Sequence, residues 1–268
     1  MKPRTRRIVY SLAVLVWSAV LLYFYASGRV NKYLATDFRL LTLLGGLGLA
    51  VLGLFNLLTA GHEAECGHDH GGEDAHDHES GDINPLTAFV LMVVPIAFSA
   101  AWTKDEYSVA ALSRKGLYET PGNIGSPISP LPLTLEEIEK NHRRTADGFI
   151  EFNLMELFFA TGDREFQFLL DGIKVQTDGR WINEKTRNPD GTRKRLYRLF
   201  LTCCAADSRA IPIILEFDRP APEFPENSWV KVSGTMRFPM EAGALQPVLR
   251  VEHVVATVPP PEENFMRK

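Results

Sequence analysis

The chain has 268 residues, of which 45% are hydrophobic and 23% are charged, and its formal net charge is −4. This length can hold a membrane portion and one soluble domain of ordinary size. The balance of charge disfavours nucleic-acid binding, which requires several phosphates to be neutralised at once. Three cysteines, Cys66, Cys203 and Cys204, are too few and too unevenly spaced for the disulfide framework of a small secreted domain.

Three long apolar segments in the N-terminal part predict helices that cross a membrane. Residues 8–26 and 40–60 contain no charged side chain and are long enough, at about 1.5 Å per residue, to span the hydrocarbon layer. Residues 86–102 are shorter and contain Pro95, so this helix is at the lower limit of a span and is expected to kink. A cleaved signal peptide is the alternative for the first segment, although its apolar run is long for one. We expect two or three transmembrane helices.

The second apolar segment carries small residues along one face. Gly46, Ala50 and Gly53 are spaced by about one helical turn, and such a stripe lets another helix approach closely. The alternative is ordinary membrane composition, because glycine is common in transmembrane helices. The stripe predicts a partner helix without identifying it.

Basic residues predict the orientation of these helices. Four of them precede the first segment: Lys2, Arg4, Arg6 and Arg7. An excess of Lys and Arg favours the cytoplasmic side, so three crossings would place residues 61–82 in the cytoplasm and the C-terminal domain outside. Arg29, Lys32 and Arg39, which lie in or next to the first loop, reduce this bias.

Residues 61–82 concentrate metal-ligating side chains between the second and third apolar segments. They include five histidines, one cysteine and eight carboxylates, and no Lys or Arg occurs between Arg39 and Lys104 to compete with a bound cation. Imidazole and thiolate suit zinc, nickel or copper better than calcium or magnesium, and zinc is the first choice. The candidate ligands are His62, Cys66, His68, Asp69, His70, His76, Asp77 and His78.

The spacing within this loop predicts weak binding. Two His-Asp-His triplets repeat, and Gly71-Gly72 between them provides a hinge that lets them fold together. Each ligand recruited from a flexible segment costs ordering entropy, so we expect exchangeable binding that collects ions instead of a structural centre. A solvated acidic linker with adventitious metal affinity is the alternative.

The rest of the chain predicts a connector, a β domain and a tail. Residues 103–147 are broken by proline and glycine, residues 148–260 carry the strand patterns, and residues 261–268 follow them. Capping-box sequences predict two short helices, one opening at Thr134 and one at Asn153. The domain therefore contains some helix before its strands.

Six apolar runs predict strands, at residues 165–170, 173–182, 196–203, 210–217, 229–238 and 248–258. Taking the first two as one long bent strand gives five, the layout of a small Greek-key barrel of the oligonucleotide/oligosaccharide-binding (OB) type. Residues 218–228 are too short and proline-rich for the helix that such barrels often carry between strands three and four. An open sandwich is the alternative. The expected fold class is membrane α plus all-β, with an OB-like barrel after the membrane helices.

Nucleic-acid binding by this barrel would need aromatic side chains interleaved with cations along one face. Only residues 194–198 resemble that pattern. A basic loop beside a membrane is more simply a contact with lipid headgroups or a partner. We expect no nucleic-acid partner.

The vicinal cysteines lie at the end of a predicted strand. Strand alternation predicts a buried Cys203 and an exposed Cys204. Neighbours in a regular strand cannot both bind one metal, but a bulge at residues 205–207 would allow it. The open alternatives are a small core residue beside an incidental one, a second metal point with Asp207, and a redox thiol.

The order of these features, together with T-C-C-A-A-D at residues 202–207, W-V-K-V-S-G at residues 229–234 and P-P-E-E-N-F near the end, resembles a known family. That family comprises the small subunits of two-component membrane permeases. Its members carry a C-C-x-A-D element and are encoded beside a larger predicted permease. The resemblance implies an accessory subunit in a bacterial inner membrane, with the lipid bilayer and the larger permease as its partners.

These observations together predict a permease accessory subunit that handles a divalent transition metal such as zinc. The alternatives are a membrane-tethered OB-like binding module with the His-rich loop as a linker, and a thiol redox protein that uses the vicinal cysteines. We expect no enzyme, because the chain has no C-x-x-C motif, no nucleophile with an adjacent base and no phosphate-binding loop.

Overall fold

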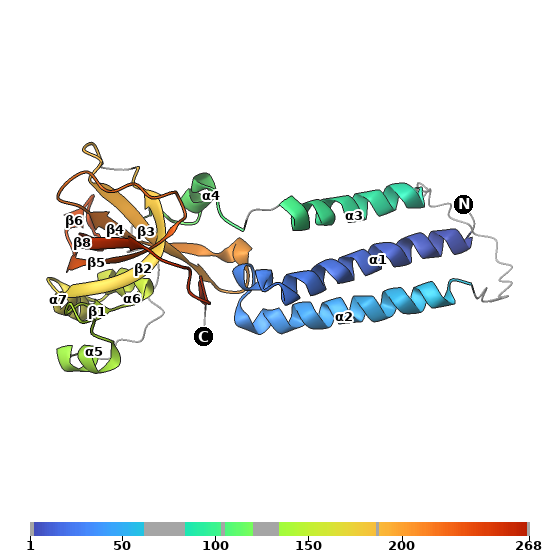
Figure 1. Ribbon diagram of the computed structural model, residues 1–268, viewed down its shortest axis with the longest axis horizontal. Coiled ribbons are helices and arrows are strands. Elements are labelled where there is room, and N and C mark those ends of the chain that lie inside the picture. Colours follow the sequence, from blue (N-terminus) through green and yellow to red (C-terminus); the bar gives the residue numbers. More distant parts are fainter. Residues whose placement is uncertain (1–2, 62–83, 103–104, 120–133, 186–187, 267–268) are drawn as a thin grey trace, which may run out of the picture. The chain divides into compact units, whose positions relative to one another are not determined.

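The computed structural model describes residues 3–61, 84–102, 105–119, 134–185 and 188–266. The chain divides into two compact units, Met1–Asp105 and Glu106–Lys268. The first unit is helical, and the second contains the strands (Figure 1).

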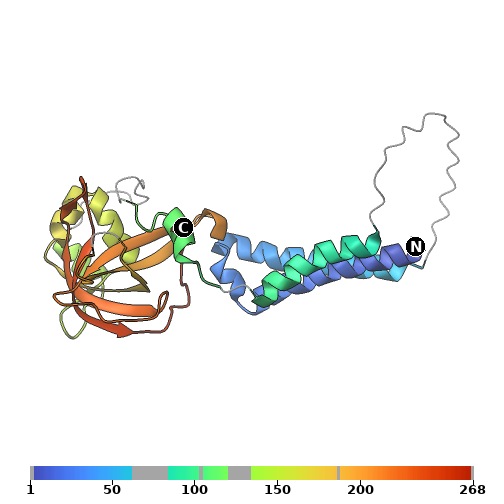
Figure 2. The ribbon, with the colours of Figure 1, turned by 90° about the horizontal axis from the view of Figure 1, so that it is seen from above.

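The helical unit confirms the three apolar segments as long helices. They are α1 (Pro3–Ala26), α2 (Thr36–Thr59) and α3 (Pro85–Trp102), with the short 3-10 helix η1 (Arg29–Lys32) between the first two. The three α-helices run side by side in both views (Figures 1 and 2). Each is long and apolar enough to cross a membrane, with mean hydropathies of 2.0, 2.1 and 1.9. These three candidate spans indicate a membrane protein.

The small-residue stripe of α2 packs against α1 of the same chain. A Cβ added to Gly46 would lie 2.9 Å from Leu22 Cδ2, and one added to Gly53 would lie 2.7 Å from Leu15 Cδ2. The close approach also lets the Ser18 hydroxyl donate to the Gly46 carbonyl oxygen, at 2.7 Å. The predicted partner helix is thus internal, and a side chain at Gly46 or Gly53 would have to displace a leucine of α1.

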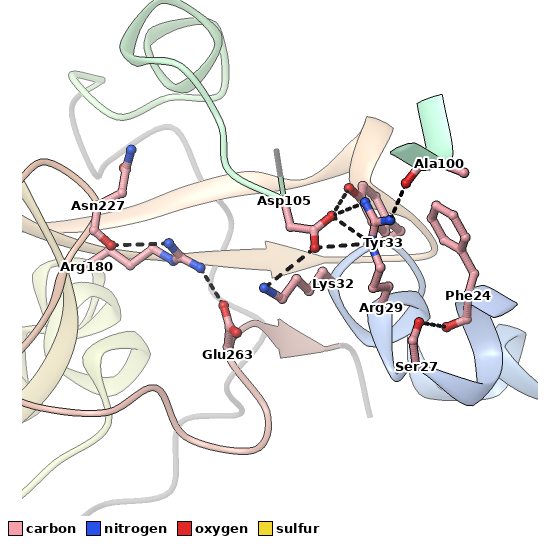
Figure 3. A network of polar contacts seen from close by, with 10 residues as sticks. All are labelled: Phe24, Ser27, Arg29, Lys32, Tyr33, Ala100, Asp105, Arg180, Asn227 and Glu263. Carbon is pink, nitrogen blue, oxygen red and sulfur yellow. Dashed lines mark hydrogen bonds and ion pairs between the residues drawn. The ribbon is translucent and has the colours of Figure 1, made fainter. Parts of the chain in front are cut away.

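A polar cluster joins the ends of α1 and α3 (Figure 3). The Arg29 guanidinium forms an ion pair with Asp105 at 2.8 Å and donates to the Ala100 carbonyl oxygen at 2.7 Å. The Tyr33 hydroxyl donates to the same carboxylate at 2.6 Å. Because Asp105 follows α3 and Arg29 follows α1, the cluster ties two helix ends together just outside the apolar spans.

The second unit begins with short helices and continues as strands. The helices are α4 (Val109–Arg114), α5 (Leu135–Asn141), α6 (Leu154–Phe159), η3 (Ala160–Gly162), α7 (Arg164–Leu170) and η4 (Ala205–Asp207). The strands are β1 (Ile150–Glu151), β2 (Lys174–Asn183), β3 (Arg193–Leu201), β4 (Arg209–Glu216), β5 (Trp229–Arg237), β6 (Met240–Glu241), β7 (Ala244–Leu245), β8 (Val248–Ala256) and β9 (Phe265–Met266). Capping boxes at Thr134 and Asn153 open α5 and α6, as predicted.

Five strands close into a barrel. Antiparallel pairing joins β2 to β3, β3 to β4, β5 to β8 and β2 to β5, while β4 and β8 pair in parallel. The resulting ring, β2-β3-β4-β8-β5 and back to β2, has the strand order of an OB-fold. The OB-like barrel is confirmed and the open sandwich is excluded, because the β2–β3 pairing leaves no gap between the first and last strands of the ring.

The barrel interior is a continuous apolar core. Trp181, Leu196, Ile213, Val230 and Leu249 come from five different strands and are fully buried. Helices α6 and α7 add Leu154, Leu157 and Leu170 to the same cluster. No helix occupies the β4–β5 connection, as the short and proline-rich segment 218–228 predicted.

One predicted strand is wrong: residues 165–170 form helix α7. The Asp163 side chain accepts hydrogen bonds from the amides of Glu165 and Phe166 and so caps the helix. The alternation of residues 165–168 fits a strand, but Phe166, Leu169 and Leu170 recur at helical spacing and face the core. Phe168, on the opposite side, is 84% exposed. The cap and this helical face decide the structure.

Candidate metal site

The vicinal cysteines lie in a tight turn and not in a strand. Strand β3 ends at Leu201, and the chain passes through Cys203 and Cys204 into the 3-10 helix η4. The prediction of one buried and one exposed thiol is wrong: both are half-buried, because strand alternation no longer applies beyond Leu201. The turn brings both sulfur atoms and an Asp207 carboxylate oxygen within 4.8 Å of one another.

Reciprocal hydrogen bonds hold the three ligand groups together. The Asp207 carboxylate accepts from the backbone amides of Cys203, at 2.8 Å, and Cys204, at 3.1 Å. In return, the Cys204 sulfur accepts from the Asp207 amide, which completes a capping box around η4. The convergence for which a bulge at residues 205–207 was predicted comes instead from the 3-10 helix η4.

The two thiols differ in acidity. A hydrogen bond to Asp207, and a second to Cys204, raise the pKa of Cys203 to about 11. Hydrogen bonds from the amides of Ala206 and Asp207 lower the pKa of Cys204. Partial burial acts to raise the pKa of Asp207, but hydrogen bonds from Cys203 and from backbone amides outweigh it and hold that pKa below its usual value. Cys204 is therefore the thiol that ionises first.

A segment preceding the barrel anchors the turn. The Lys115 ammonium donates to the carbonyl oxygens of Ala205 at 2.9 Å, Ala206 at 3.3 Å and Ser208 at 3.3 Å. The Tyr107 hydroxyl also donates to Ala205, at 2.9 Å. These bonds satisfy the carbonyl groups of η4 and fix the turn against the residues around α4.

Two sulfur donors and one carboxylate form a ligand set that suits zinc and similar soft or borderline ions. Zinc is usually tetrahedral, so three protein ligands leave one position for an external ligand. Both thiols are free and able to serve as ligands. The same two cysteines could instead act as redox thiols, which was the alternative given by the sequence, and this role stays a prediction.

The other predicted ligands cannot be placed. His62, Cys66, His68, Asp69, His70, His76, Asp77 and His78 all lie outside the residues that the structure describes. The metal-collecting role of the His-rich loop therefore stays a prediction. Of the predicted candidates, Cys203, Cys204 and Asp207 are the ones brought together in the described part of the chain.

The sequence interpretation missed the residues that support the turn. Tyr107 and Lys115 lie in what was taken for a broken connector, where α4 was not expected. Ser108 caps α4 by accepting from the Ala111 amide, so a serine before Val-Ala-Ala-Leu was the available signal. Nothing local indicates that Lys115 reaches η4, because that contact spans about ninety residues of sequence.

The outer face of the barrel at β3 is occupied by the chain itself. Leu112 and Leu117 pack there with Tyr197, Leu199 and Leu201, and all five are buried. OB-folds that bind oligonucleotides use the face formed by their second and third strands, which here are β3 and β4. A nucleic acid would have to displace this packing.

Comparison with known proteins places the chain in a family. Residues 9–115 match the DUF1980 N-terminal domain, and residues 165–266 match the DUF1980 C-terminal domain. The chain belongs to the DUF1980 family. The C-terminal match contains the cysteine turn. The N-terminal match contains Tyr107 and Lys115, the two residues that hold the turn. These two matches show DUF1980 domains and name no permease, so the resemblance to permease small subunits stays a prediction.

The chain matches no curated protein. Among solved structures, a small single-stranded DNA-binding protein from Streptomyces coelicolor is similar over 33% of this chain and 95% of that one, with 11% identity and a TM-score of 0.24. A DUF3299 family protein from Pseudomonas aeruginosa PAO1 is similar over 33% of this chain and 64% of that one, with 13% identity and a TM-score of 0.23. Scores this low carry no conclusion about function.

Proposed function

We propose that this DUF1980 protein is a membrane accessory subunit of a two-component permease and binds a divalent transition metal such as zinc. The observation that carries the metal role is the convergence of two thiols and a carboxylate within 4.8 Å at the end of β3. The proposed location is a bacterial inner membrane, with the N-terminus in the cytoplasm and the barrel outside.

The surface of α3 supports a larger membrane partner. No residue of this helix is buried within the chain, and its apolar side chains are widely exposed, with Leu91 at 65% and Trp102 at 70%. Midway along the helix, the indole Nε1 of Trp17 in α1 donates to the Met92 carbonyl oxygen at 3.1 Å. A helix with so much free surface within its own chain has room for a second membrane protein as well as for lipid.

The permease partnership predicts a stable complex in detergent. We expect the full chain, expressed with a larger permease of the kind that the resemblance implies, to co-purify with that protein in a fixed ratio. Pull-down followed by mass measurement of the complex would test this. A full chain that purifies alone under conditions where both proteins are present and folded would contradict the subunit role.

The His-rich loop is proposed to collect ions on the cytoplasmic side of the membrane, whereas the cysteine turn binds metal on the other side. Deleting residues 62–78 from the full chain should lower the number of zinc ions bound, because it removes five histidines and Cys66, while leaving one tighter site at the turn. Calorimetric titration of both proteins in the same detergent measures this. Equal stoichiometry in the two proteins would reject the collecting role, and loss of all binding on deletion would reject the turn as a site.

A further inference from the structure

A pocket of about 430 Å³ lies directly beside the cysteine turn. Its lining includes Arg114, Lys115 and Glu119 on one side and Asp207 and Arg209 on the other. Asp207 therefore belongs both to the pocket and to the proposed metal site. Anything that fills the pocket lies next to a metal ligand.

The charges around this pocket favour an anion. Three cationic side chains face two carboxylates, and Asp207 is already engaged with the cysteine amides. The Lys115 ammonium is held by backbone carbonyls. Arg114 and Arg209 are exposed and form no ion pair within the described residues. Two guanidinium groups are thus available to bind an oxyanion, which they recognise through paired hydrogen bonds.

The metal site leaves one coordination position that such an anion would fill. Two thiolates and a carboxylate around a divalent ion fill three tetrahedral positions and leave an excess of negative charge. A fourth ligand that is itself anionic would be repelled unless cations lie nearby. Arg114 and Arg209 provide those cations on the Asp207 side of the site.

We propose that the pocket binds a small di- or tricarboxylate, one carboxylate of which completes the coordination of the metal while Arg114 and Arg209 bind the others. The inference rests on the proposed function, since it takes the cysteine turn as the metal site. The volume is at the small end of ligand pockets, which suits a metabolite-sized chelate. The protein would then accept its metal as a carboxylate complex and not as a free aqueous ion.

Cobalt(II) provides a direct test, because its visible spectrum reports both thiolate ligation and the identity of the remaining ligand. The protein with residues 62–78 deleted is loaded with cobalt in detergent and titrated with citrate. We expect the visible bands to shift while the thiolate bands persist. In R114A/R209A, cobalt should bind as before, but citrate should bind at least about tenfold more weakly, the scale of one lost charge-assisted hydrogen bond.

The control variant R143A/R164A removes two other exposed arginines and should respond to citrate like the parent protein. Two results would overturn the carboxylate pocket and leave the metal site intact. One is that cobalt binds but citrate does not change its spectrum. The other is that R114A/R209A binds citrate with the same affinity as the parent protein. An equal response to inorganic phosphate would overturn its assignment to carboxylates. If cobalt does not bind at the turn at all, both the proposed function and this inference fail.

Discussion

Replacing either cysteine of the turn by serine should abolish tight zinc binding. In a protein without residues 62–78, C203S and C204S each remove one of three converging ligands. We expect the zinc affinity to fall by more than ~10²-fold. Losing only a residue that hydrogen-bonds to a metal ligand already costs about 10- to 100-fold, and the loss of a ligand itself costs more. D207N should also weaken binding, because it removes the third ligand and the acceptor that holds both cysteine amides. Isothermal calorimetry with zinc would measure these effects.

Thr202 is the matched control for this series. It is exposed, it precedes the two cysteines, and its side chain is not part of the ligand group, so T202A should bind zinc like the parent protein. Wild-type zinc affinity in the C203S/C204S double variant would reject the site. Insulin-reducing activity that disappears in C204S, together with unchanged zinc binding, would instead favour the redox alternative.

The substitution G234A should strongly destabilise the barrel. Gly234 lies in β5 at an irregularity in its pairing with β8. A Cβ there would lie 2.0 Å from the Arg250 carbonyl oxygen and 2.8 Å from its carbonyl carbon. Both atoms belong to the backbone of the paired strand, so a side-chain rotation cannot relieve the overlap. We expect the free energy of unfolding to fall by about 3 kcal/mol or more, the upper range for overpacking.

Thermal unfolding followed by circular dichroism of the full chain in detergent would measure this loss. For a domain of this size the expected decrease in Tm is on the order of 10 °C. Gly162 is the control, because a Cβ added there meets no atom within 4 Å, and G162A should unfold near the parent temperature. A G234A protein that melts with the parent would mean that β5 and β8 are not paired as described.

Much of the architecture was predictable because it depends on local patterns. A membrane span requires a long uncharged run, since no water is present to solvate charges there, and residues 8–26, 40–60 and 86–102 satisfy that requirement. The OB-like barrel followed from six apolar runs bounded by turn residues, the first two taken as one bent strand, of which residues 173–182 alone correspond to a barrel strand. The capping boxes at Thr134 and Asn153 indicated helix starts because the capping hydrogen bonds join residues only three positions apart.

The site was only partly predictable. The residue types Cys203, Cys204 and Asp207 indicated metal or redox chemistry, but a strand pattern running through residues 196–203 implied that the thiols point apart. Their actual convergence depends on β3 ending at Leu201. Lys115 and Tyr107 support that turn from a distant part of the chain. A contact of that kind leaves no trace in local spacing.

The sequence by itself determined the membrane helices, the five barrel strands and the identity of the candidate ligands, because these follow from hydrophobic length, periodicity and side-chain chemistry. The tertiary structure alone decided that α1 is the helix facing the glycines of α2, and that two thiols and one carboxylate meet beside a cationic pocket. The physical reason is that each of these outcomes depends on contacts between residues far apart in the chain, and local propensity does not encode such contacts.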